Sequence, residues 1–71
     1  MSLYTIKKEH RCIIENLPKI GLLKSLGLRE GINVAIKSKQ PMGGPVIVQV
    51  GRRCVAIAQD IAKDIQVREV S

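Results

Sequence analysis

Three side chains in this sequence could bind a metal or act as nucleophiles: His10, Cys12 and Cys54. His10 and Cys12 are two residues apart. On a β-strand they would therefore project from the same face, where Cys54 could join them. A structural zinc site normally takes four N or S ligands, and this chain has no CxxC or HxH pair. His10 and Cys12 are thus weak metal candidates. We predict no metal site, with two buried thiols and an exposed imidazole.

Catalytic chemistry is not indicated by the remaining polar residues. A nucleophile needs a base and a third group that orients this base. Cys54 and His10 could meet only through long-range folding, and no third member stands out. Asp60 and Asp64 share one polar turn, where we expect them to be solvated rather than paired. We therefore predict a non-enzymatic protein that needs no cofactor.

The formal net charge of +6 suits an acidic or phosphate-bearing partner, or simply a well-solvated surface. A basic patch for nucleic acid could come from Lys37, Lys39, Arg52 and Arg53. Proteins that bind single strands usually stack bases on aromatic side chains, and Tyr4 is the only aromatic residue here. Nucleic-acid binding is therefore the alternative function. The same lack of aromatics argues against recognition of proline-rich peptides.

The backbone that must position these residues reads as one mainly-β domain over residues 1–71. Valine and isoleucine dominate the apolar content and favour strands. Apolar residues recur within 11–16, 33–39, 46–50, 53–58 and 64–70, and the segments are separated by glycine-rich turns. Five short strands at this spacing predict a small barrel. The two-residue gap at Gly51 and Arg52 predicts a type II′ hairpin turn.

One short helix is predicted after the first strand. The sequence Asn16-Leu17-Pro18 offers a start, because a proline tolerates the first helical turn. Ile20, Leu23 and Leu26 would face the core, and Gly27 would end the helix in a left-handed conformation. One of the leucines at 22, 23, 26 and 28 could remain at the surface as a partner anchor. Residues 59–63 are expected to form only a single 3₁₀-like turn.

Residues 40–45 form the longest turn signal, with two prolines and two glycines. Met42 would lie at the tip of this loop. Its flexible, polarizable side chain suits a contact surface that must adapt to a partner. The alternative is a plain connector in which Met42 folds over the end of the barrel.

The segment LLKSLGLREG at 22–31, followed by Val34, resembles the LxxLGLxPGxxV signature of the FeoA family. Further blocks of that family are similar to Pro41-Met42-Gly43-Gly44-Pro45 with the alternating valines, to Gly51 with Val55-Ala56-Ile57, and to Ala62 with Ile65 and Val67. The blocks occur in the same order over nearly the whole chain. The main departure is Glu30, where the family often has proline.

This resemblance implies a small SH3-like barrel with a helix inserted after the first strand. It also implies a cytoplasmic accessory protein of bacterial ferrous iron uptake. The implied partner is FeoB, a membrane permease with a cytosolic GTPase domain. A similar barrel forms the C-terminal domain of iron-dependent repressors, but no DNA-binding helix-turn-helix precedes it here. The sequence has no signal-peptide pattern and no apolar run of membrane-spanning length, which agrees with a cytoplasmic location.

We expect the partner to contact Pro41, Met42 and Gly43 of the loop, the helix surface around Lys24, and the basic residues Lys37 and Lys39. Positive charge at such a surface would speed encounter with an acidic GTPase domain more than it would add affinity. Besides nucleic-acid binding, a cytosolic iron-binding regulator that uses His10 and Cys12 is a third hypothesis.

Overall fold

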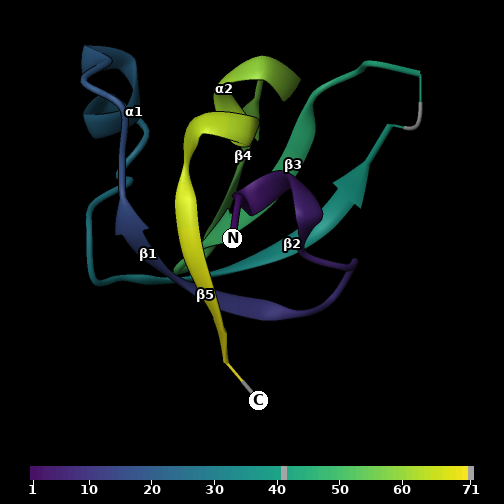
Figure 1. Cartoon of the computed structure of the whole chain (residues 1–71), viewed down its shortest axis with the longest axis horizontal. Helices are drawn as coiled ribbons and strands as arrows, with labels where there is room; N and C mark the ends of the chain where they lie inside the picture. The colour runs from purple at the N-terminus through teal and green to yellow at the C-terminus, as the bar shows by residue number, and fades with distance from the viewer. Residues whose placement is uncertain (41, 71) are drawn as a thin grey trace.

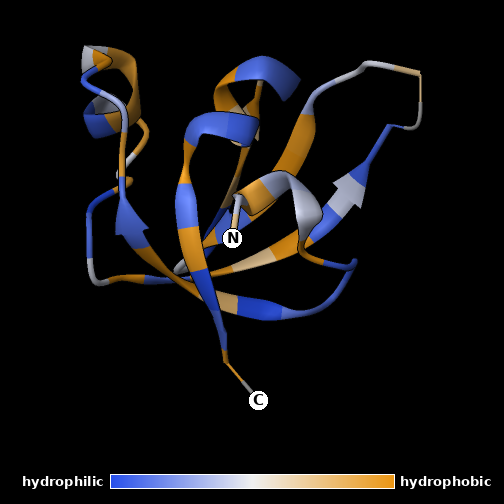
Figure 2. Ribbon diagram, viewed as in Figure 1, coloured by the Kyte–Doolittle hydropathy of each residue, from blue (hydrophilic) through white to orange (hydrophobic). Residues whose placement is uncertain are grey.

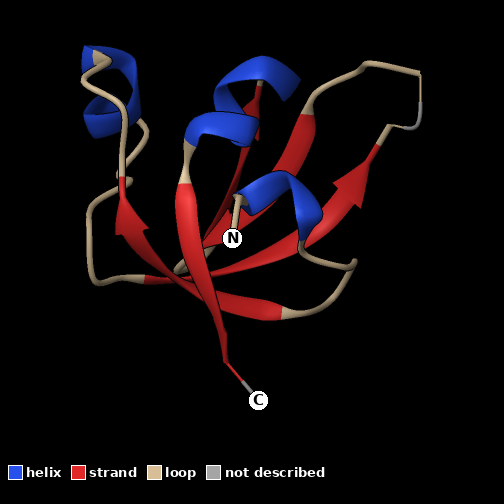
Figure 3. Cartoon of the chain, in the orientation of Figure 1, coloured by secondary structure: helices blue, strands red, loops and turns tan. Residues whose placement is uncertain are grey.

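The computed structural model describes residues 1–40 and 42–70. Figure 3 shows a mainly-β domain, as predicted. Its elements are, in chain order, η1 (Leu3–Thr5), β1 (Arg11–Asn16), α1 (Gly21–Ser25), β2 (Asn33–Lys39), β3 (Val46–Val50), β4 (Arg53–Ile57), α2 (Gln59–Asp64) and β5 (Gln66–Val70). The alternation of apolar residues thus located all five strands.

The strands form one curved antiparallel sheet in the order β4-β3-β2-β1-β5 (Figure 1). Within the described residues β4 and β5 remain the two edges of this sheet, so the predicted closed barrel is not confirmed. The outer edge of β5 is instead occupied at its start by the N-terminal segment. The Leu3 N–H donates to the Ile65 carbonyl at 2.8 Å, and the Val67 N–H donates to the Met1 carbonyl at 2.7 Å. Those backbone groups are therefore taken by residues 1–3 rather than by β4.

The core lies inside the curve of the sheet, and Figure 2 shows apolar and polar residues alternating along the strands. Each central strand contributes alternate aliphatic side chains to it, as a half-buried sheet requires. The N-terminal segment packs against this core through Leu3 and Ile6. Among the described residues, those that are buried are Leu3, Ile6, Cys12, Ile14, Leu23, Leu28, Val34, Ile36, Val46, Val48, Ile57, Ala62, Ile65 and Val67.

Cys54 is exposed, which corrects the prediction that both thiols are buried. It lies on β4, an edge strand whose inward positions are Val55 and Ile57. The intervening residue therefore faces outward. Cys12 is buried as predicted.

The helix α1 starts at Gly21, three residues later than the predicted start at Pro18. The Ile20 N–H donates to the Pro18 carbonyl at 2.8 Å, and Ile20 itself is extended, so a turn precedes the helix. The helix ends as predicted, with Gly27 at a φ of 87°. The Leu28 N–H reaches the Leu23 carbonyl and the Gly27 N–H reaches the Lys24 carbonyl, both at 3.0 Å. This pair of bonds is a Schellman motif.

Residues 59–64 form an α-helix, α2, rather than the predicted 3₁₀-like turn. The Ala62 N–H donates to the Ala58 carbonyl at 2.9 Å, which is the i→i−4 bond of an α-helix. Ala62 and the following Ile65 are both buried in the core. Packing therefore stabilises a helix that is too short to persist by its own propensity.

The turn between β3 and β4 agrees with the type II′ prediction. Val50 pairs with Arg53 across a two-residue loop, and Gly51 has a φ of 65°. A type II′ turn requires a positive φ at its first central residue, where glycine carries no steric cost.

Candidate partner-binding surfaces

The residues predicted to contact a partner fall on separate parts of the molecule. Figure 1 shows α1, which carries Lys24, on one side and the loop between β2 and β3 on the opposite side. Lys37 lies on β2, on the outer face of the sheet. A single flat partner surface therefore cannot cover all of the predicted residues together.

The loop between β2 and β3 presents Met42, whose side chain is 94% exposed. It does not fold over the end of the sheet. Gly43, also exposed, has a φ of 88°, and a Cβ there would lie 3.3 Å from the Gln59 side-chain oxygen. The loop therefore passes close to α2, and glycine allows that approach. The predicted contact residue Pro41 lies outside the described residues.

Lys39, another of the predicted contact residues, is in contact with Tyr4. Its Nζ donates to the Tyr4 carbonyl at 3.0 Å and lies 5.4 Å from the centre of the Tyr4 ring. The Nζ of Lys63 is also 5.4 Å from that centre, and the Gln59 Nε2 donates to the Tyr4 hydroxyl at 2.8 Å. The only aromatic ring thus ties η1 to the end of β2 and to α2. Sequence reasoning missed this cluster, although a single tyrosine among many lysines is a signal for cation–π contact.

The α1 surface exposes apolar side chains beside a lysine. Leu22 is 57% exposed and Ile20 is 36% exposed, whereas Leu23 is buried at 1%. Of the leucines at 22, 23, 26 and 28, Leu22 is therefore the one that remains at the surface. Lys24, in the last helical turn, is also exposed. This arrangement combines an apolar anchor with a positive charge.

An open groove of about 980 Å³ runs beside α1. Its lining combines apolar side chains with Lys19, Lys24, Arg29 and Glu30. The far end of the helix is fixed by Arg53, whose Nη2 donates to the Leu26 carbonyl at 2.9 Å. A cation at this position also interacts favourably with the carbonyl end of a helix. The helix that borders the groove is therefore held at its C-terminal end by a side chain of β4.

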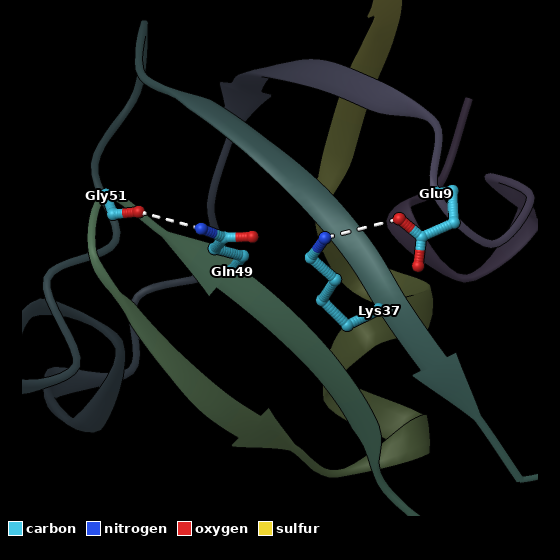
Figure 4. Close-up of polar contacts among 4 residues, drawn as sticks. All are labelled: Glu9, Lys37, Gln49 and Gly51. Atoms are coloured by element: carbon cyan, nitrogen blue, oxygen red, sulfur yellow. Dashed lines mark hydrogen bonds and ion pairs between the residues drawn. The ribbon is translucent and has the colours of Figure 1, made fainter.

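The basic patch expected for nucleic acid is not assembled. Lys37 forms an ion pair with Glu9 at 3.2 Å, drawn in Figure 4, and Lys39 is engaged by Tyr4. Arg53 donates to the end of α1. The structure thus gives three of the four predicted basic residues internal partners.

His10 and Cys12 do not form a common ligand pair. The His10 Nδ1 lies at ion-pair distance from the Glu69 carboxylate at the surface, whereas Cys12 is buried in the core. Burial, assisted by the Glu69 charge, raises the pKa of Cys12 to about 11. The thiol therefore stays protonated at neutral pH, and a thiol must ionise to bind a metal. Within residues 1–40 and 42–70, no three His, Cys, Asp or Glu side chains are grouped for metal binding.

In the part of the chain that the structure describes, no helix has the length and apolar character that a membrane crossing requires.

Fold and surfaces together define a small, mainly-β domain of SH3-like architecture with two short helices. The sequence profile of the FeoA domain matches residues 1–69. The chain therefore belongs to the FeoA family of ferrous iron transport accessory domains, as its sequence motifs indicated.

Solved structures agree with this assignment. A crystal structure of an iron uptake regulatory protein (FeoA) is 26% identical, with a TM-score of 0.88 over 99% of this chain and 97% of that chain. The FeoA protein from Chlorobium tepidum is 21% identical, with a TM-score of 0.88 over 100% of this chain and 71% of that chain. The fold also matches ScaR with bound Zn²⁺, at 19% identity and a TM-score of 0.86, over 99% of this chain and 37% of that chain. Among proteins with curated descriptions, none is significantly similar.

Proposed function

We propose that this protein is a non-enzymatic, cytosolic accessory module of ferrous iron transport. It binds the cytosolic part of a FeoB-type permease and thereby modulates uptake. Membership of the FeoA family supports the transport role. The contact with the permease and its site are our inference.

The observation that carries this proposal is the exposed apolar surface of α1. Leu22 on α1 is 57% exposed, and Ile20, which is 36% exposed, lines the groove together with Lys24 and Arg29. Large exposed aliphatic side chains beside a concave surface are typical of a protein contact. Among the described residues, neither Lys24 nor Arg29 has an ion-pair partner. Their charges can therefore attract an acidic partner, in agreement with the net charge of +6.

The loop with Met42 is a second contact in this proposal. It lies across the molecule from α1, so it would meet either another part of the same partner or a second subunit (Figure 1). Lys37 and Lys39 support this contact less directly, because both already have internal partners.

The test is an NMR titration of the ¹⁵N-labelled protein with the isolated GTPase domain of its permease, with and without a GTP analogue. We expect localised shifts at residues 20–25, and smaller ones at 42–44. Leu22→Gln and Lys24→Glu should each weaken binding about tenfold without unfolding the domain. Lys8→Glu, which makes the same charge change in the exposed turn before β1, is the matched control and should bind normally.

Undiminished binding by folded Leu22→Gln and Lys24→Glu would remove α1 from the interface. If Met42→Ala then weakens binding, the loop is the contact. If no variant or wild-type protein responds to the GTPase domain, random RNA should be titrated at low and at physiological salt. Binding that falls steeply with salt would support the nucleic-acid alternative.

A further inference from the structure

A polar hollow lies on the outer face of the sheet, away from both surfaces described above. The strand register places Arg11, Ala35 and Gln49 in one row across β1, β2 and β3. Ala35 is the small member of this row, so the long side chains around it surround a hollow of about 250 Å³. Asn33 and Lys37 complete its polar walls.

Two hydrogen bonds hold these walls in position, as Figure 4 shows. The Lys37 Nζ donates to the Glu9 carboxylate at 3.2 Å, and the Gln49 Nε2 donates to the Gly51 carbonyl at 3.1 Å. Side chains that are already ordered lose little further entropy when a ligand binds. The hollow is therefore preorganised from two sides.

Hydrogen-bond donors exceed acceptors around this hollow. Arg11 carries five N–H donors and, within the described residues, has neither an ion pair nor a side-chain hydrogen bond. Lys37 and Gln49 retain further N–H groups after their bonds to Glu9 and Gly51. Glu9 is the one carboxylate in the lining, and it offsets the charge of Lys37. The lining therefore keeps about one uncompensated positive charge, that of Arg11.

We propose that this hollow binds a carboxylate group, with Arg11 as its principal ligand. A planar guanidinium matches a carboxylate through two parallel hydrogen bonds. A single negative charge balances the charge left on Arg11, whereas a phosphate dianion would remain partly unneutralised. The carboxylate comes either from a small free monocarboxylate or from an acidic side chain of a polypeptide. This proposal does not depend on the permease contact.

The test is an NMR titration of the full ¹⁵N-labelled chain at constant ionic strength. The probes are acetate, a capped Gly-Glu-Gly peptide and inorganic phosphate. We expect saturable shifts at the amides of Ala35, Gln49 and Gly51, with a Kd on the order of millimolar for a carboxylate probe. Binding of acetate alone identifies a free small carboxylate as the ligand. Binding of the peptide identifies an acidic side chain.

Arg11→Gln should weaken the binding at least about tenfold. Ala35→Leu should abolish it by filling the hollow, which is open enough to solvent for the larger side chain to be tolerated. Arg29→Gln removes the same charge beside α1 and should bind as the wild type does. The proposal is overturned if phosphate binds as tightly as the carboxylates or if folded Arg11→Gln binds normally. Absence of saturable shifts at tens of millimolar probe also overturns it.

Discussion

Replacement of Gly27 by alanine tests how the end of α1 is fixed. Gly27 has a φ of 87°, which costs an alanine about 1–2 kcal/mol. A Cβ at this position would also collide with the Arg53 guanidinium. Arg53 would then have to release the Leu26 carbonyl, and this loss costs about 0.5–1.5 kcal/mol. We therefore expect Gly27→Ala to lower the free energy of unfolding by about 1.5–3.5 kcal/mol, the sum of the two costs.

Gly31→Ala is the matched control for this substitution. Gly31 has a similar φ of 90°, but a Cβ there would meet no atom within 4 Å. Its cost should be the backbone strain alone, about 1–2 kcal/mol. The assay is urea unfolding followed by circular dichroism, where a domain of this size has an m-value of about 1 kcal/mol/M. The two variants should therefore be separated by a difference of about 1 M in midpoint.

Arg53→Ala completes a double-mutant cycle with Gly27→Ala. Without the guanidinium the collision disappears, so Gly27→Ala should then cost only the strain. We expect a coupling of about 1 kcal/mol for residues 27 and 53, and none for 31 and 53. Equal costs for the two glycine substitutions, or an additive Gly27–Arg53 cycle, would refute the reasoning about this contact.

Four further predictions concern leucine exposure, thiol labelling, thiol ionisation and one hydrogen bond. Leu22→Ala should change the free energy of unfolding by less than about 0.5 kcal/mol, whereas Leu23→Ala should cost about 2–4 kcal/mol in the same urea assay, because only Leu23 is buried. In the native protein a thiol reagent should label Cys54 rapidly and Cys12 only after unfolding, and simultaneous labelling would contradict the burial of Cys12. The pKa of Cys12 is raised from 9.0 to about 11, so the unfolded state loses this proton first as the pH rises, and stability should fall between pH 9 and 11 in the wild type. A Cys12→Ala variant should lack this component of the decline. An identical pH dependence of stability in the variant and the wild type would argue against a contribution from Cys12. Tyr4→Phe removes the hydroxyl that accepts from α2 and should cost about 0.5–1.5 kcal/mol; no change in the urea midpoint would mean that this bond contributes nothing.

The strands could be predicted from the sequence because apolar residues that recur at every second position fit a β-strand with one buried face. Val34 and Ile36, or Val46 and Val48, recur at every second position and do point into the core, whereas the residues between them, Ala35 and Ile47, are less buried. The end of α1 was equally predictable, since Gly27 adopts the positive φ that glycine favours. Both are local patterns, and local patterns can be identified in the sequence without knowledge of the tertiary structure.

The predictions differ from the structure where contacts with a segment distant in the sequence determine the local conformation. Residues 59–64 become an α-helix because the sheet buries Ala62. Lys39 turns toward Tyr4, which is 35 residues away in the sequence. Closure of the sheet depends on whether β5 pairs with β4 or with the N-terminal segment, and the alternation pattern is the same in both cases. The candidate surfaces could likewise not be predicted, because the sequence does not show which leucine near α1 is exposed to solvent.

The pairing of residues 1–3 with the start of β5 has a consequence for how the chain folds during synthesis. Met1 and Leu3 bond to Val67 and Ile65, and β1 takes β5 as a neighbour. Residues 1–3 leave the ribosome before residues 65–67 and cannot form these bonds until the later segment has been made. Until then β1 is an unprotected strand edge, and such edges recruit other chains. The closing step joins segments far apart in sequence, so we expect it to limit the folding rate. A nascent chain stalled before Ile65 would be the form most exposed to aggregation.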